Sequence, residues 1–105
     1  DYDMVASAGN NPLLPILEFI AQGRDIGLHM IVTRRMGGAG RAMFDPIISR
    51  IRELASPGIM MSGDKNEGAL LGNMKPQLLP PGRGWLITRR EGARLIQIGW
   101  QPPPM

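Results

Sequence analysis

The chain has 105 residues, 43% of them hydrophobic, which is enough for a hydrophobic core but for no more than one small domain. It contains no cysteine and one histidine, which excludes disulfide bonds, thiolate zinc sites, thiol catalysis and two-histidine metal sites. Its net charge of +3 comes mainly from arginines spread along the chain, and this modest excess does not by itself indicate nucleic-acid binding. No apolar run is long enough to cross a bilayer and no secretory leader is visible, so we expect a soluble, cytosolic chain.

The first third of the chain predicts a loop, a helix and a buried strand. Residues 1–11 are small and polar, and the start without Met suggests a fragment. Asn11-Pro12 is typical of a helix N-cap, and apolar residues then recur at helical spacing until Gly23 and Gly27. The continuous apolar run of residues 28–32 favours a strand covered on both faces, as in a parallel sheet. His29 lies in this run, and we expect a hydrogen-bonded core histidine there and not a catalytic one.

The middle of the chain predicts a second helix. Residues 37–40 lack the lysine and hydroxyl of a phosphate loop, so we expect a flexible linker there. Asp45-Pro46 repeats the capping signal before an amphipathic helix at 47–55, in which Arg50 and Glu53 are spaced to pair on the exposed face. The positions of the two helices expected to be buried are Leu17, Ile20, Ile48 and Ile51.

The last part predicts a short strand at 59–61, a short helix at 66–71, an irregular loop at 73–84 and a β-hairpin. The hairpin strands, residues 85–88 and 94–98, flank a turn at 90–93, and the tail 101–105 is expected to be flexible. Helices alternating with strands predict an α/β fold with a mostly parallel sheet and helices on its faces. Two strands and a hairpin make a poor sheet alone, so we expect the missing strands upstream.

Four segments, in this order, resemble one family. Residues 1–3 (DYD) are similar to the end of a Walker B strand, and residues 23–35 resemble the next strand of FtsK/SpoIIIE-type motors. Residues 67–72 (EGALLG) are similar to a late element of that family, and residues 80–84 (PPGRG) precede the hairpin as they do there. Together they resemble the last ATPase module of EccC-type motors of actinobacterial type VII secretion, over nearly the whole chain.

The resemblance implies the C-terminal half of a RecA-like P-loop NTPase module, whose Walker A half would precede residue 1. It implies ATP and Mg²⁺ as cofactors of the complete module, with none bound by this chain alone, and no catalytic residue or protein-bound metal within it. By position, the residues expected near the nucleotide are Asp1, Thr33 and Arg34. The family's γ-phosphate-sensing glutamine is replaced here by Arg34, and an arginine finger expected near residues 55–58 is missing. Loss of a finger lowers turnover strongly, so the resemblance implies a degenerate, regulatory module.

The resemblance also implies partners and a place in the cell. These are the upstream half of the module, other motor subunits in a hexamer when active, and small helical-hairpin substrates with a WXG motif. Neither nucleic acid nor direct membrane insertion is expected, and the parent complex would hold the chain at the inner face of the cell membrane. A DNA-translocating FtsK-type motor is the alternative, and a free-standing binding domain without nucleotide is a third possibility.

A substrate peptide would bind as an amphipathic helix in an apolar groove. Leucines before a Pro-Pro turn are unusual in a solvated loop, so the residues expected to line this groove are Met60, Leu78, Leu79 and Trp85. The competing interpretation is that these leucines seal the hairpin onto its own sheet.

Overall fold

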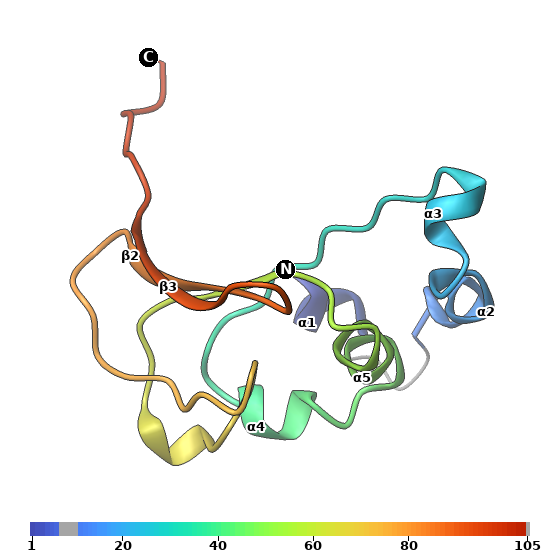
Figure 1. Ribbon diagram of the computed structural model, residues 1–105, viewed down its shortest axis with the longest axis horizontal. Coiled ribbons are helices and arrows are strands. Elements are labelled where there is room, and N and C mark those ends of the chain that lie inside the picture. The colour runs from blue at the N-terminus through green and yellow to red at the C-terminus, as the bar shows by residue number, and fades with distance from the viewer. Residues whose placement is uncertain (7–10, 105) are drawn as a thin grey trace. The chain divides into compact units, whose positions relative to one another are not determined.

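The computed structural model describes residues 1–6 and 11–104, which form two compact units, Asp1–Ser56 and Pro57–Met105 (Figure 1). Unit 1 is built from helices and unit 2 around a small sheet. In the described residues, no helix is both long and apolar enough to cross a membrane.

Unit 1 contains short helices and one longer one. They are α1 (Tyr2–Ala6), the 3-10 helix η1 (Leu14–Ile16), α2 (Leu17–Ile20), α3 (Gly23–Ile26), α4 (Ala39–Ala42) and α5 (Pro46–Glu53). The predicted second helix is therefore confirmed as α5. The predicted first helix is broken into η1, α2 and α3, and only α3 ends at a predicted glycine, Gly27, which has a φ of 74°.

Asp45 starts α5 as the sequence predicts. Its Oδ2 accepts hydrogen bonds from the amides of Ile47 and Ile48 at 3.0 and 3.1 Å, and Pro46 follows at the first helical position. Arg50 and Glu53 pair at 3.1 Å on the exposed face, as expected.

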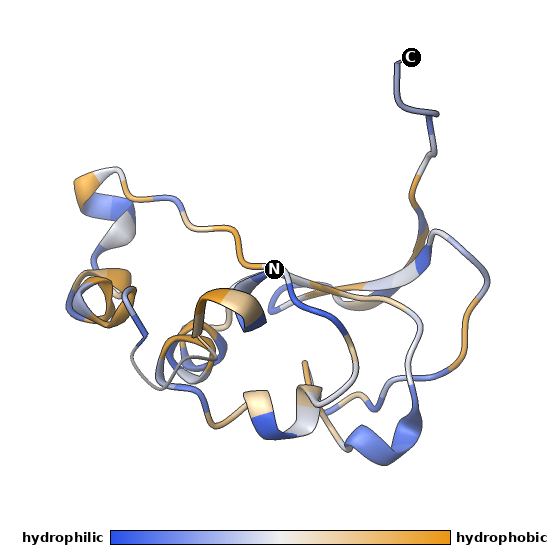
Figure 2. Ribbon diagram, turned by 180° about the vertical axis from the view of Figure 1, so that it is seen from behind, coloured by the Kyte–Doolittle hydropathy of each residue, from blue (hydrophilic) through white to orange (hydrophobic). Residues whose placement is uncertain are grey.

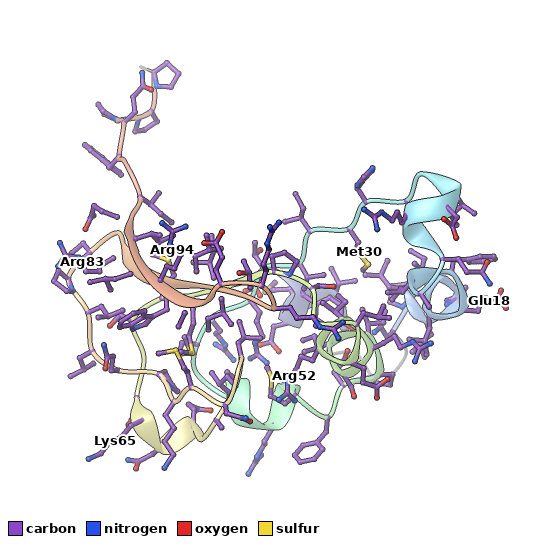
Figure 3. The ribbon with its side chains drawn as sticks, in the orientation of Figure 1. Glu18, Met30, Arg52, Lys65, Arg83 and Arg94 are labelled. Atoms are coloured by element: carbon purple, nitrogen blue, oxygen red, sulfur yellow. The ribbon has the colours of Figure 1, made fainter. Side chains whose placement is uncertain are left out.

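The core of unit 1 lies between α1, α2 and α5. Tyr2, Ile47 and Ile48 are buried. Around them pack partly buried residues that include Leu17, Ile20, Met30, Val32 and Ile51. Figure 2 shows hydrophobic residues on these helices, and Met30 points from its extended segment toward them in Figure 3. Of the four helix positions predicted to be buried, Ile48 is buried and the other three are partly buried.

The strand predicted at 28–32 has no strand partner among the described residues, so this prediction is wrong for the structure as described. Burial nevertheless alternates along it: Met30 and Val32 are partly buried, whereas His29 is exposed and Ile31 is 93% exposed. The expectation of a core histidine is therefore wrong. The segment is extended with one face packed, because none of the described residues of unit 1 covers the other face.

The loop predicted for residues 1–11 is wrong in its first half, where α1 forms. Residues 7–10 lie outside the described part. The linker predicted at 37–40 contains the start of α4 instead, and Gly38 caps it with a φ of 81°. Both helices are four or five residues long, too short for a periodic apolar pattern to reveal.

Unit 2 contains β1 (Gly58–Met60), the 3-10 helix η2 (Lys65–Glu67), β2 (Arg83–Thr88) and β3 (Gly92–Gln97). The predicted hairpin is confirmed as β2 and β3, and the predicted short strand as β1, one residue earlier. The helix predicted at 66–71 is only the turn η2, because Gly68 adopts a φ of 82° and ends it.

The sheet has the strand order β1-β2-β3, and both pairings are antiparallel. The mostly parallel sheet is thus not seen among the described residues, because the long loop between β1 and β2 reverses the chain direction without a crossover helix. One face of the sheet is packed: Met60 and Ile87 are buried, and so are Leu70 and Pro76 of the loop between β1 and β2. A Cβ on Gly58 would lie 2.6 Å from Cδ1 of Leu71, so a larger residue there would force the end of the Leu71 side chain to move.

Candidate functional site

A cavity of about 320 Å³ lies within unit 1. α1, α4, the start of α5 and the turn at residues 34–38 surround it, so segments distant in sequence supply its charged groups. These groups are Asp3, Arg34, Arg35, Arg41 and Asp45. Three guanidinium groups face two carboxylates, which leaves the lining with an excess of positive charge.

Asp3 holds two of the arginines. Its carboxylate lies 3.5 Å from Arg34 and 3.3 Å from Arg35. Arg34 also donates from Nε to the Arg35 carbonyl and from Nη2 to the Gly37 carbonyl, both at 3.0 Å. With 14% of its side chain exposed, Arg34 is fixed by these contacts and shapes the turn that carries Gly37 and Gly38.

Tyr2 connects the cavity to the core. Its amide donates to the Thr33 carbonyl at 2.7 Å, which ties α1 to the extended segment. Its hydroxyl donates to Asp45 Oδ2 at 2.7 Å and accepts from Asn11 Nδ2 at 2.7 Å. Burial, together with the hydrogen bond to Asp45, raises the pKa of Tyr2 from 10.0 to about 12.

The three residues predicted to lie near the nucleotide do not all line the cavity. Arg34 lines the cavity, whereas the side chains of Asp1 and Thr33 are exposed and do not line it. The Tyr2–Thr33 bond still brings the two segments together, and Asp1 Oδ1 accepts from the Asp3 amide at 3.2 Å. Their role toward a nucleotide stays a prediction.

Sequence reasoning missed most of the cavity. From the sequence, Asp3 belongs only to the segment that resembles the end of a Walker B strand, and Asp45 is only a helix cap. The side chains of Tyr2, Arg35 and Arg41 have no role of their own in the sequence analysis. The Asp3–Arg34 pair joins residues 31 positions apart and Tyr2–Asp45 joins residues 43 positions apart, so no local spacing signals either contact. The described residues include no group of three or more acidic or histidine side chains that could hold a metal ion.

The predicted groove residues all belong to unit 2. Met60 and Trp85 are directly opposite each other on β1 and β2, and Met60 is buried. Leu79 is partly buried and its amide donates to Ser62 Oγ at 3.0 Å, whereas Leu78 is 85% exposed. The Trp85 indole N–H is buried and has no hydrogen-bond partner among the described residues. An unpaired buried donor is costly, so it would gain from an acceptor supplied by a ligand.

No family model matches the chain. Among curated proteins, the EccC protein of the Thermomonospora curvata ESX secretion system is 59% identical over 101 residues, 96% of this chain. The ESX-4 protein EccC4 of Mycobacterium tuberculosis is 48% identical over 104 residues, 99% of this chain. The chain spans about 8% of the length of these relatives.

Solved structures agree. The cytoplasmic domain of the T. curvata type VII secretion ATPase EccC matches with a TM-score of 0.92 and 58% identity, over 98% of this chain and 12% of that one. T. curvata EccC (ATPases 2 and 3) in complex with a signal sequence peptide matches with the same TM-score and identity, over 98% of this chain and 18% of that one. The chain therefore belongs to the EccC family of ESX type VII secretion proteins, of which it corresponds to a short segment.

Proposed function

We propose that the chain is part of a degenerate ATP-binding module of a type VII secretion motor, which docks small helical-hairpin substrates and regulates their export. The observation that carries this proposal is the match to T. curvata EccC (ATPases 2 and 3), because that relative is in complex with a signal sequence peptide. The motor would be a hexamer when active and would lie at the inner face of the membrane. The cytoplasmic side is supported by the match to the cytoplasmic domain of T. curvata EccC.

The proposed module is RecA-like, and residues 28–33 would be one strand of its parallel sheet. Their alternating burial and the exposure of Ile31 are what a strand shows when its neighbours are missing. The bond from the Tyr2 amide to the Thr33 carbonyl places the end of this segment beside the start of α1. In open parallel sheets, ligands bind beyond the carboxyl ends of neighbouring strands. Asp1, Thr33 and Arg34 occupy such positions if the upstream strand ends at Asp1.

Nucleotide turnover by this module would be weak. Arg34 stands where the resembled family has a phosphate-sensing glutamine, and it already donates to two backbone carbonyls and pairs with Asp3. A side chain held in this way is poorly placed to sense whether a γ-phosphate is present. ATP and Mg²⁺ would therefore stabilise the module and set its contacts with other subunits, with little hydrolysis of its own.

Substrate docking would use unit 2. Leu78 is exposed, which disfavours the interpretation that both leucines only seal the hairpin onto the sheet. Leu79 and Trp85 are partly buried, and Met60 lies directly opposite Trp85 on the neighbouring strand. An apolar anchor of a helical peptide could contact Leu78 and Leu79. The comparisons favour this secretion role over a DNA-translocating motor, because the matched relatives are ESX secretion proteins.

An export assay tests the proposal. Cells in which the intact protein carries Leu79→Ala should secrete several-fold less of a WXG-motif substrate at unchanged protein level. Leu14→Ala is the matched control, since Leu14 is 41% exposed in unit 1 and should leave export unchanged. Normal export from the Leu79→Ala cells would remove this loop from the docking site.

A further inference from the structure

The sheet of unit 2 ends in an open edge at β3. β3 is the terminal strand in the order β1-β2-β3, and none of the described residues of unit 2 pairs with its outer side. The edge is six residues long and contains no proline, and its register with β2 shows no bulge. Such an edge offers unpaired backbone groups to another strand unless something blocks it.

The register identifies which backbone groups are free. The Ile98 amide donates to the Gly82 carbonyl at 2.7 Å, so this pair is hydrogen-bonded, and hydrogen-bonded pairs alternate along an antiparallel ladder. The amides of Arg94 and Ile96 therefore point toward β2. The amides and carbonyls of Ala93, Leu95 and Gln97 point outward, which gives three donors and three acceptors with the spacing of a strand partner.

The side chains at this edge differ between the two faces. Leu95, on one face, is 51% exposed opposite Trp85. Arg94, on the other face, is 64% exposed, and its pair with Glu91 is on the surface. Beyond the strand, Ile98 and Trp100 are 43% and 82% exposed. The edge thus presents an apolar position on one face and a positive position on the other.

Charge is concentrated at this hairpin. Unit 1 has six basic and six acidic residues, so the whole net charge of +3 comes from unit 2, with six basic and three acidic residues. Four arginines and a single acidic residue lie between positions 83 and 94, and Arg83 and Arg94 project from the two strands (Figure 3). Like charges opposite each other destabilise a strand pair. The charge therefore disfavours pairing with a second copy and favours an acidic strand.

We propose that the outer edge of β3 binds an extended segment of a partner protein by strand addition, with acidic residues beside Arg94 and apolar residues beside Leu95. Backbone hydrogen bonds supply the affinity and the alternating side chains the specificity. This site is distinct from the predicted helix groove at Leu78 and Leu79. It also requires no nucleotide.

Fluorescence anisotropy with the intact protein tests the proposal, using a labelled ten-residue peptide of alternating valine and glutamate. We expect saturable binding that weakens with salt. Leu95→Pro, which removes an outward amide and no bond to β2, should weaken binding at least tenfold. Leu95→Ala keeps that amide and should weaken binding only a few-fold. Arg94→Gln should reduce the salt dependence.

Ala93→Pro removes another outward amide and replaces Leu95→Pro if that variant fails to fold. The proposal is overturned by absence of binding, by equal affinity of the proline and alanine variants, or by equal binding of a valine-lysine peptide. It is also overturned if gel filtration shows that β3 pairs with a second copy. Leu79→Ala should not alter this affinity, so failure of the helix groove and failure of the β3 edge are distinguishable.

Discussion

A single carboxylate oxygen, Asp45 Oδ2, links three parts of unit 1. It caps α5 by accepting from two amides, and it accepts from the Tyr2 hydroxyl, which in turn accepts from Asn11. α1, the segment before η1 and α5 therefore share one hydrogen-bond network below the cavity. Removing the carboxylate would leave several of these donors unpaired at once.

Asp45→Ala should lower the local stability of α5 by about 2 kcal/mol, because a cap and a partly buried side-chain bond are lost together. Asp45→Asn should recover most of the loss, since an amide oxygen can accept the same bonds. Asp64→Ala is the matched control: Asp64 caps η2 through one exposed bond to the Asn66 amide, and its loss should cost about 0.5 kcal/mol. Hydrogen exchange of the α5 amides measures the effect. Equal losses for Asp45 and Asp64 would contradict the network.

The Tyr2 hydroxyl should lose its proton at a higher pH than an ordinary tyrosine. Its pKa is raised to about 12 in the folded chain from 10.0, because burial and the Asp45 carboxylate disfavour the phenolate. A raised pKa means that its contribution to stability is complete below pH 10 and is lost as the pH rises toward 12. NMR of ring-labelled tyrosine, with Tyr2→Phe to assign the signal, should show no titration of Tyr2 near pH 10. A midpoint at pH 10 would show that the hydroxyl is not held as described.

At the residue scale, the sequence predicted the N-cap of α5 but did not predict the long-range side-chain contacts. Asp45 and the Arg50–Glu53 pair follow from local spacing, and both are confirmed. The ion pairs of Asp3 with Arg34 and Arg35 could not be predicted, because residues so far apart in sequence leave no local pattern. The resemblance drew attention to Asp1 and Arg34, whereas the structure adds Tyr2 and Asp3 as the residues that hold these segments together.

At the scale of elements, the sequence predicts what local contacts determine. The hairpin was predictable because its two apolar strands and its turn are close in sequence. The strand at 28–32 was not observed, because a strand exists only with hydrogen-bonding neighbours, and unit 1 supplies none within residues 1–6 and 11–56. The alternating burial of residues 28–32 agrees with the predicted extended conformation. The predicted burial of both faces was wrong.

The hairpin turn depends on one glycine. Gly92 has a φ of 72°, a conformation that costs an L-residue about 1 kcal/mol, and a Cβ there would meet no atom within 4 Å. Gly92→Ala should therefore destabilise β2 and β3 by about 1 kcal/mol through the backbone alone. Gly99→Ala is matched for space but lacks a positive φ, and it should have almost no effect. Hydrogen exchange of the hairpin amides compares the two, and equal effects would contradict the strain.

At the scale of the whole molecule, the two units differ in structure and in net charge. Unit 1 has a cavity lined by three arginines but no net charge, whereas unit 2 has the sheet, the residues predicted for the groove and the whole positive excess. Membership of the EccC family explains why the residues resemble parts of an ATPase module while the phosphate loop is not among them.

The affinity of the intact protein for a C-terminal signal peptide of a WXG-motif substrate tests the proposed docking function most directly. Calorimetric titration should show saturable binding by the wild type. Leu79→Ala should weaken it by ~1–3 kcal/mol, about 5- to 150-fold, with little change in melting temperature. Leu14→Ala should bind as the wild type does. Unaltered affinity in a folded Leu79→Ala protein would contradict the groove, and absence of any peptide binding by the wild type would contradict the docking function itself.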